Sequence, residues 1–128
     1  RGMSRLLKDC FRVVDRVYRF GGEEFVVMLR APDHQVAFGA LERFRRHLQT
    51  FEFPTVGTVT ASVGLTEILP DDSPSTACYR ADQAVYHAKR NGRNRVCAHA
   101  DLVNLGLLPS TVKASDVESF WENCQRLN

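Results

Sequence analysis

Residues 17–29 read VYRFGGEEFVVML and place two glycines between two apolar runs. Glycine adopts positive φ angles without a steric penalty from Cβ, so Gly21 and Gly22 in this setting predict a hairpin turn. Two adjacent carboxylates, Glu23 and Glu24, follow the glycines. Such oxygen ligands suit a hard cation such as Mg²⁺ and the phosphates that it carries. The alternative, from these residues alone, is a solvated acidic hairpin tip.

The composition is that of one small globular domain. The chain has 128 residues, of which 44% are hydrophobic and 25% charged. A net charge of +2 is too small to argue for nucleic acid or an anionic membrane as the partner, and we expect no nucleic-acid partner. No apolar run approaches the length of a membrane span. The four cysteines are dispersed and form no CxxC pair, which predicts reduced thiols and a cytoplasmic location.

Periodicity and capping residues predict three helices and two strands around the hairpin. The helices are expected over residues 1–11, from an N-cap at Asp33 to about His47, and from Ser73-Pro74 to Asn91-Gly92. The strands are expected over residues 55–68 and 95–98. The apolar stripe of the second helix is expected to consist of Val36, Ala40, Leu41, Phe44 and Leu48.

The character of the chain changes from Asp101 onward. Residues 105–109 look like a linker, and residues 115–118 (SDVE) form a capping-box sequence that predicts a last helix. One face of this helix carries Val117, Phe120, Trp121, Cys124 and Leu127. This face is expected to pack on its own domain; a following module and a dimer contact are the alternatives. We therefore divide the chain into residues 1–99 and a linker with a trailing helix, residues 100–128.

Four segments match the motifs of one protein family. They are the pentad GGEEF, Arg12 to Asp15 as an RxxD motif with five residues between Asp15 and Gly21, residues 60–64 (TASVG) as a TxSxG strand ending, and residues 81–96 (ADQAVYHAKRNGRNRV), which are similar to ADxALYxAKxxGRNxV. Residues 1–98 thus resemble the GGDEF family of diguanylate cyclases. The resemblance implies an α/β (α+β) fold with a palm-type, nucleotide-cyclase-like sheet flanked by helices, and only a structural role for TxSxG.

The resemblance also implies a reaction and its residues. Two GTP molecules are joined into cyclic di-GMP, and each domain of a homodimer presents one GTP. Glu23 is a metal ligand and a candidate for deprotonating the 3′-OH, Glu24 is a second ligand of Mg²⁺ (or Mn²⁺) or an orienting partner, and the two glycines let the backbone approach the nucleotide. Lys89 and Arg93, four residues apart at a predicted helix end, hold the triphosphate. The alternative is that these cations only stabilise the helix dipole.

An inhibitory product site is implied at Arg12 and Asp15. An arginine fork can donate to the O6/N7 edge of guanine, and a carboxylate can accept from its N–H groups. Arg43 stands where the family often supplies a second arginine for cyclic di-GMP. The alternatives are a surface ion pair between Arg12 and Asp15 and a solvated helix position for Arg43. His87 is expected to be an ordinary helix residue.

One departure from the family concerns the region before the pentad. The family motifs DxLTGLxNR and DxDxFKxxND, which supply a metal-binding aspartate and guanine contacts, lie well upstream, and only twenty residues precede Gly21 here. We therefore expect the C-terminal two-thirds of a GGDEF domain, inactive as given, from a parent protein that is a cyclase. The alternatives are a catalytically inactive sensor of cyclic di-GMP and a dimerising regulatory module.

Overall fold

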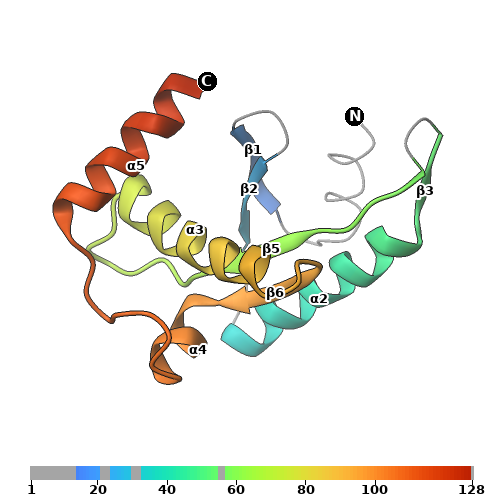
Figure 1. Ribbon diagram of the computed structural model, residues 1–128, viewed down its shortest axis with the longest axis horizontal. Helices are drawn as coiled ribbons and strands as arrows, with labels where there is room; N and C mark the ends of the chain where they lie inside the picture. The colour runs from blue at the N-terminus through green and yellow to red at the C-terminus, as the bar shows by residue number, and fades with distance from the viewer. Residues whose placement is uncertain (1–13, 21–23, 30–32, 55–56, 128) are drawn as a thin grey trace.

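The structure is a computed structural model that describes residues 14–20, 24–29, 33–54 and 57–127. Within these ranges, helices lie around short strands, and the expected α/β class is confirmed (Figure 1). The helix predicted over residues 1–11 lies outside the described residues. No described helix is both long enough and apolar enough to cross a membrane.

The first two strands form the predicted hairpin. β1 (Val14–Phe20) runs antiparallel to β2 (Glu24–Leu29). The strands stay in register from Arg16 onward, and the pairing is irregular at Asp15. The hairpin is thereby confirmed, while its turn at residues 21–23 lies outside the described residues.

The next element, α2 (His34–Thr50), begins at the predicted N-cap. The side chain of Asp33 accepts a hydrogen bond from the Val36 amide at 2.9 Å. The buried face follows the helical repeat and consists of Ala37, Leu41, Phe44 and Leu48. The prediction that Val36 belongs to this face is wrong. Its side chain is 47% exposed, because it lies one position away from the repeat.

A parallel β–α–β unit forms the centre of the described chain. β5 (Ser62–Leu65) pairs in parallel with β6 (Arg95–Ala98), and α3 (Pro74–Arg90) connects them. The predicted N-cap of α3 is confirmed, because Ser73 and Thr76 form a reciprocal capping box. The buried face of α2 packs on apolar residues of β5 and β6, so the core lies between α2 and this pair of strands.

Gly64 explains how closely α3 lies on β5. A Cβ atom built at this position would stand 2.7 Å from the backbone nitrogen of Val85 and would also press on the carbonyl oxygen of Ala81. Atoms cannot approach the backbone this closely, so only glycine fits. The TxSxG segment therefore has the structural role predicted for it.

The single strand predicted over residues 55–68 is wrong in its extent. The segment holds β4 (Gly57–Thr58) and β5, which are separate strands. β4 pairs antiparallel with β3 (Glu52–Phe53), whereas β5 pairs with β6. The chain changes pairing partner between the two strands and therefore cannot continue as one. The described strands form three two-stranded sheets, β1–β2, β3–β4 and β5–β6.

Two helices complete the described chain. α4 (His99–Asn104) follows β6 directly and is not predicted by the sequence pattern. α5 (Ala114–Leu127) starts before Ser115, so the predicted capping box is wrong in position. The Val117 amide donates to the carbonyl oxygen of Lys113 at 3.1 Å, which places the first turn of α5 earlier than the SDVE sequence suggests.

The predicted apolar face of α5 packs against α3. The rings of Phe120 and Tyr79 stand edge to face with their centroids 5.6 Å apart, and Val117 is buried. Ahead of α5 in the sequence, Nε2 of His34 lies 3.5 Å from Oδ2 of Asp101 and links the start of α2 to α4. The C-terminal segment is thus joined to both long helices of the preceding unit (Figure 1).

Candidate functional site

The loop between α3 and β6 carries the two predicted phosphate-binding cations. α3 stops at its predicted end, with Asn91 as the C-cap, and Lys89 is half-buried in its last turn. The next three residues all have positive φ angles, which are 108° for Gly92, 61° for Arg93 and 45° for Asn94. Glycine and asparagine tolerate this region, whereas arginine enters it at an energetic cost.

Hydrogen bonds from both sides hold this backbone in place. The Arg93 amide donates to the carbonyl oxygen of Ala88 at 2.9 Å and closes the helix. The Arg93 carbonyl oxygen accepts from Nε of Arg95 at 3.2 Å. The Arg93 side chain is exposed, and within the described part of the chain its guanidinium has no hydrogen bond or ion pair. The loop therefore has a fixed backbone and carries a cation that has no partner among the described residues.

Asn94 is attached to α2 through three of its atoms. Its side-chain oxygen and its carbonyl oxygen accept from the same nitrogen of Arg45, at 3.0 and 3.4 Å. Its side-chain nitrogen donates to Gln49 at 2.9 Å. Arg45 is itself held by Glu42, with contacts of 2.6 and 3.0 Å, and this hydrogen bond lowers the pKa of the Glu42 carboxyl.

Arg43, predicted for the product site, lies on α2 and is exposed. A Cβ atom at Gly39 would stand 3.7 Å from one of its terminal nitrogens, so the guanidinium folds back along the helix by one turn. The described residues do not show whether Arg12 and Asp15 lie near Arg43. Arg12 lies outside the described residues, and Asp15 is placed only as a backbone position in β1.

Only Glu24 of the acidic pair Glu23 and Glu24 lies within the described residues. Glu24 opens β2 opposite Phe20, while Gly21, Gly22 and Glu23 lie outside the described residues. Their roles stay predictions. Among the residues that the structure does describe, no group of three or more His, Cys, Asp or Glu side chains could hold a metal ion.

The chain matches a family described as diguanylate cyclase, GGDEF domain, over residues 1–95. The chain belongs to the GGDEF family. Diguanylate cyclase A of Treponema denticola is 37% identical to it over 98 residues, and diguanylate cyclase DgcP of Pseudomonas aeruginosa is 39% identical over 93 residues. These matches cover 73% and 70% of this chain but 26% and 14% of those proteins. The chain therefore spans about a quarter or less of their lengths.

Solved GGDEF structures share the fold. The GGDEF domain of DgcB from Caulobacter crescentus, in complex with c-di-GMP, matches with a TM-score of 0.67 at 29% identity, covering 77% of this chain and 61% of that chain. The active GGEEF domain of a diguanylate cyclase from Vibrio cholerae matches with a TM-score of 0.64 at 29% identity, covering 77% and 64%. The predicted nucleotide-cyclase-like fold is confirmed.

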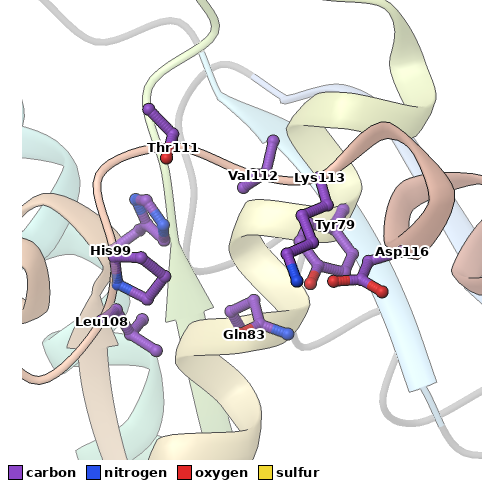
Figure 2. A pocket seen from close by; sticks show the side chains of 9 residues that line it. Tyr79, Gln83, His99, Leu108, Thr111, Val112, Lys113 and Asp116 are labelled. Carbon is purple, nitrogen blue, oxygen red and sulfur yellow. The ribbon is translucent and has the colours of Figure 1, made fainter.

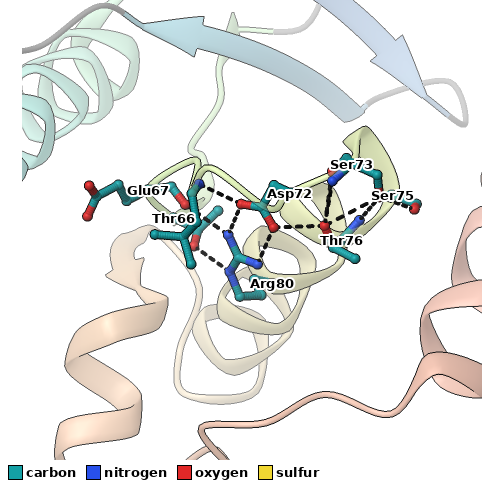
Figure 3. A network of polar contacts seen from close by, with 8 residues as sticks. Thr66, Glu67, Asp72, Ser73, Ser75, Thr76 and Arg80 are labelled. Atoms are coloured by element: carbon teal, nitrogen blue, oxygen red, sulfur yellow. Dashed lines mark hydrogen bonds and ion pairs between the residues drawn. The ribbon is translucent and has the colours of Figure 1, made fainter.

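Sequence reasoning missed a polar network at the start of α3 in this GGDEF domain (Figure 3). Arg80 donates to both oxygens of the Asp72 carboxylate, at 2.7 and 2.5 Å, and reaches the Glu67 carbonyl oxygen at 2.9 Å. The pKa of the Asp72 carboxyl lies well below its usual range, chiefly because Arg80 donates hydrogen bonds to it. The network fixes the β5–α3 loop, and an Asp–Arg spacing of eight residues gives no local signal for it.

A cavity of about 200 Å³ lies between α3 and the segment that joins α4 to α5 (Figure 2). Gln83, His99 and Lys113 contribute polar groups, and Leu108 and Val112 contribute apolar ones. Burial, reinforced by Arg80, lowers the pKa of the His99 imidazole. The cavity is smaller than the ~300–1,000 Å³ typical of ligand sites. His99 and the rest of the C-terminal segment also lie beyond the residues that match the GGDEF family.

Proposed function

We propose that the protein containing this chain is a diguanylate cyclase that joins two GTP molecules into cyclic di-GMP. Each 3′-OH attacks the α-phosphate of the other GTP, the bond between the α- and β-phosphates breaks, and two pyrophosphates are released. The observation that carries the proposal is the α3–β6 loop, in which Arg93 is exposed and uncommitted within the described residues, in a chain that also bears the GGEEF hairpin. Similar proteins are named diguanylate cyclases, and one solved neighbour is described as an active GGEEF domain.

The carboxylate oxygens of Glu23 and Glu24 are suitable ligands for magnesium (or manganese). Mg²⁺ in nucleotide enzymes is usually held by one or two carboxylates together with substrate phosphates, and Glu23 and Glu24 supply two adjacent carboxylates on one hairpin. When bound, the ion would neutralise phosphate charge beside these residues. The described residues offer no competing acidic cluster, and we assign the metal to Glu23 and Glu24.

The remaining steps fall to this chain's own residues. Phosphoryl transfer depends mostly on positioning and on charge stabilisation. Lys89 and Arg93 would orient the phosphates from the end of α3, and Gly21 and Gly22 would let the hairpin backbone approach the nucleotide. Glu23 would take the proton of the attacking 3′-OH. Two copies of the domain, each with one GTP, are needed to complete the reaction, so the active form would be a homodimer. We place this homodimer in the cytoplasm.

The experiment is turnover of GTP by the full-length protein with Mg²⁺, followed by chromatography. Glu23→Gln removes the charge but keeps the size of the side chain, and we expect it to abolish cyclic di-GMP formation. Glu118→Gln changes an exposed carboxylate on α5 and serves as the control with wild-type turnover. Product from the Glu23 variant at the wild-type rate would remove Glu23 from the mechanism, and no product from the wild type would refute the proposed function.

A second candidate function is binding of cyclic di-GMP without turnover. The DgcB GGDEF domain was solved in complex with c-di-GMP. This chain carries the RxxD motif at Arg12 and Asp15, and Arg43 stands where the family often supplies a second arginine. Turnover of GTP, measured together with binding of cyclic di-GMP, distinguishes the two functions. A cyclase with this site is active and inhibited by its product, whereas a sensor binds cyclic di-GMP and leaves GTP unchanged.

A further inference from the structure

Three consecutive residues with positive φ angles are unusual outside glycine-rich turns. Gly92 is suited to this conformation, but Arg93 and Asn94 at φ angles of 61° and 45° are held there by their surroundings. Backbone strain of this kind persists only where neighbouring groups fix it, and it often marks a functional site.

The fixing groups come from α2, which is far from the loop in sequence. Nε and one terminal nitrogen of Arg45 bind both oxygens of Glu42, and this leaves the other terminal nitrogen directed at Asn94. The Arg45 side chain is only 15% exposed. Its neighbour Arg46 contacts the same carboxylate at 3.6 Å but is 69% exposed and makes no contact with Asn94. Only the planar fork of arginine can serve both partners at once.

We propose that Arg45 and Asn94 are positioning residues that hold Arg93 in place for a phosphate group of the substrate. This inference rests on the proposed function of Arg93 and extends it to two residues on a different element. In this arrangement the Asn94 side chain ties the loop to α2, so that the Arg93 backbone keeps its left-handed conformation and the Arg93 side chain leaves it in one direction. Without the tie, the same cation would be present, but its side chain would leave the loop in many directions.

The first test is the kinetics of the full-length protein with GTP. Asn94→Gly removes the two side-chain hydrogen bonds of the tie, to Arg45 and Gln49, and leaves only the 3.4 Å contact of the main-chain carbonyl oxygen. Glycine also suits a positive φ angle, so the fold should keep its stability. An arginine on the terminal phosphate, away from the bond that breaks between the α- and β-phosphates, binds substrate and transition state nearly alike. We therefore expect KM to rise about tenfold, the usual scale for a charged hydrogen bond, and kcat to stay within about twofold. Arg45→Lys should act in the same direction. Arg46→Ala is the matched control and should leave both constants unchanged.

The second test separates a positioning role from a general structural one. If Asn94 acts only through Arg93, then Asn94→Gly should have no further effect in an Arg93→Gln background. Additive effects of the two substitutions on KM would overturn the proposal. So would a wild-type KM in Asn94→Gly, if Arg93→Gln alone raises it.

A readout without turnover keeps this inference distinct from the proposed function. Inorganic tripolyphosphate can be titrated into each variant by calorimetry, whether or not the protein turns over GTP. We expect Asn94→Gly and Arg93→Gln to weaken its binding about equally, by about tenfold, and Arg46→Ala to leave it unchanged. Equal affinity of all variants and the wild type, or no binding to the wild type, would overturn the positioning role even in an active cyclase.

Discussion

Arg80 and Asp72 form a two-point ion pair at the start of α3, with nitrogen–oxygen distances of 2.7 and 2.5 Å. The side chains are only 12% and 6% exposed. The pair also gathers the Leu69 amide, at 2.7 Å, and the Thr76 hydroxyl, at 2.8 Å, around the same carboxylate. A carboxylate with this many donors anchors the loop that leads into the helix carrying Lys89.

Breaking this pair should destabilise the domain strongly. Arg80→Ala leaves a buried carboxylate without its main partner, and such changes cost about 3–5 kcal/mol. Arg46→Ala, which removes a 3.6 Å ion pair in which the arginine is 69% exposed, should cost no more than about 1 kcal/mol. Urea unfolding of both variants measures the difference. Equal losses would show that the Asp72 pair contributes no more than a surface contact.

The same pair predicts how stability changes with pH. The pKa of the Asp72 carboxyl is lower in the folded chain than its ordinary value of 3.8, chiefly because Arg80 donates to it. The unfolded chain therefore binds the proton first. The stabilisation is fully present above the ordinary pKa and is lost as the pH falls below it. Urea midpoints between pH 6 and pH 2 should fall less steeply in Asp72→Asn than in the wild type, and parallel curves would contradict the assignment.

Gly64 and Gly39 should respond to alanine with opposite signs. Gly64→Ala places a methyl group against the α3 backbone, 2.7 Å from the Val85 nitrogen, and overpacking of this kind costs about 1–3 kcal/mol or more. At Gly39, in α2, the new methyl group meets only an arginine nitrogen at 3.7 Å. Alanine there should stabilise by about 0.5–1 kcal/mol. Thermal unfolding decides, and a stable Gly64→Ala would show that α3 can move away from β5.

Product binding is expected to depend on the RxxD residues. Arg12→Ala removes a charged donor pair from guanine, so cyclic di-GMP should bind about ten- to a hundredfold more weakly, corresponding to ~1–3 kcal/mol. Arg43→Ala should weaken binding less, because Arg43 is exposed and its place in the site rests on spacing. Arg46→Ala, on the same helix, serves as the control. Calorimetry on the full-length protein gives the affinities, and unchanged binding by Arg12→Ala would make the motif a surface ion pair.

The parts of the fold that could be predicted are those with local signals. The N-cap at Asp33, the Ser73-Pro74 start and the Asn91-Gly92 stop are all where capping rules place them. The division of residues 55–68 into two strands could not be predicted, because it depends on which distant strand each half pairs with. α4 is too short to show a helical repeat in its sequence.

In the candidate site, too, some residues could be predicted from the sequence and others could not. Motif spacing identifies Lys89 and Arg93, and the structure places both at the end of α3 as expected. The attachment of Asn94 to Arg45 could not be predicted, since the two residues are 49 positions apart in the sequence. Hydrogen bonds between distant segments depend on how helices pack, and no periodicity or cap in either segment indicates them.

The left-handed backbone at Arg93 has a consequence for stability-guided redesign of this domain. A procedure that rewards relaxed backbone geometry would replace Arg93 by glycine, because glycine adopts a φ angle of 61° without strain. Stabilising substitutions of that kind often come at the expense of activity where a site is held under strain. Thermostable variants selected without an activity screen should therefore accumulate glycine at position 93, and with it lose the cation that we propose for phosphate binding.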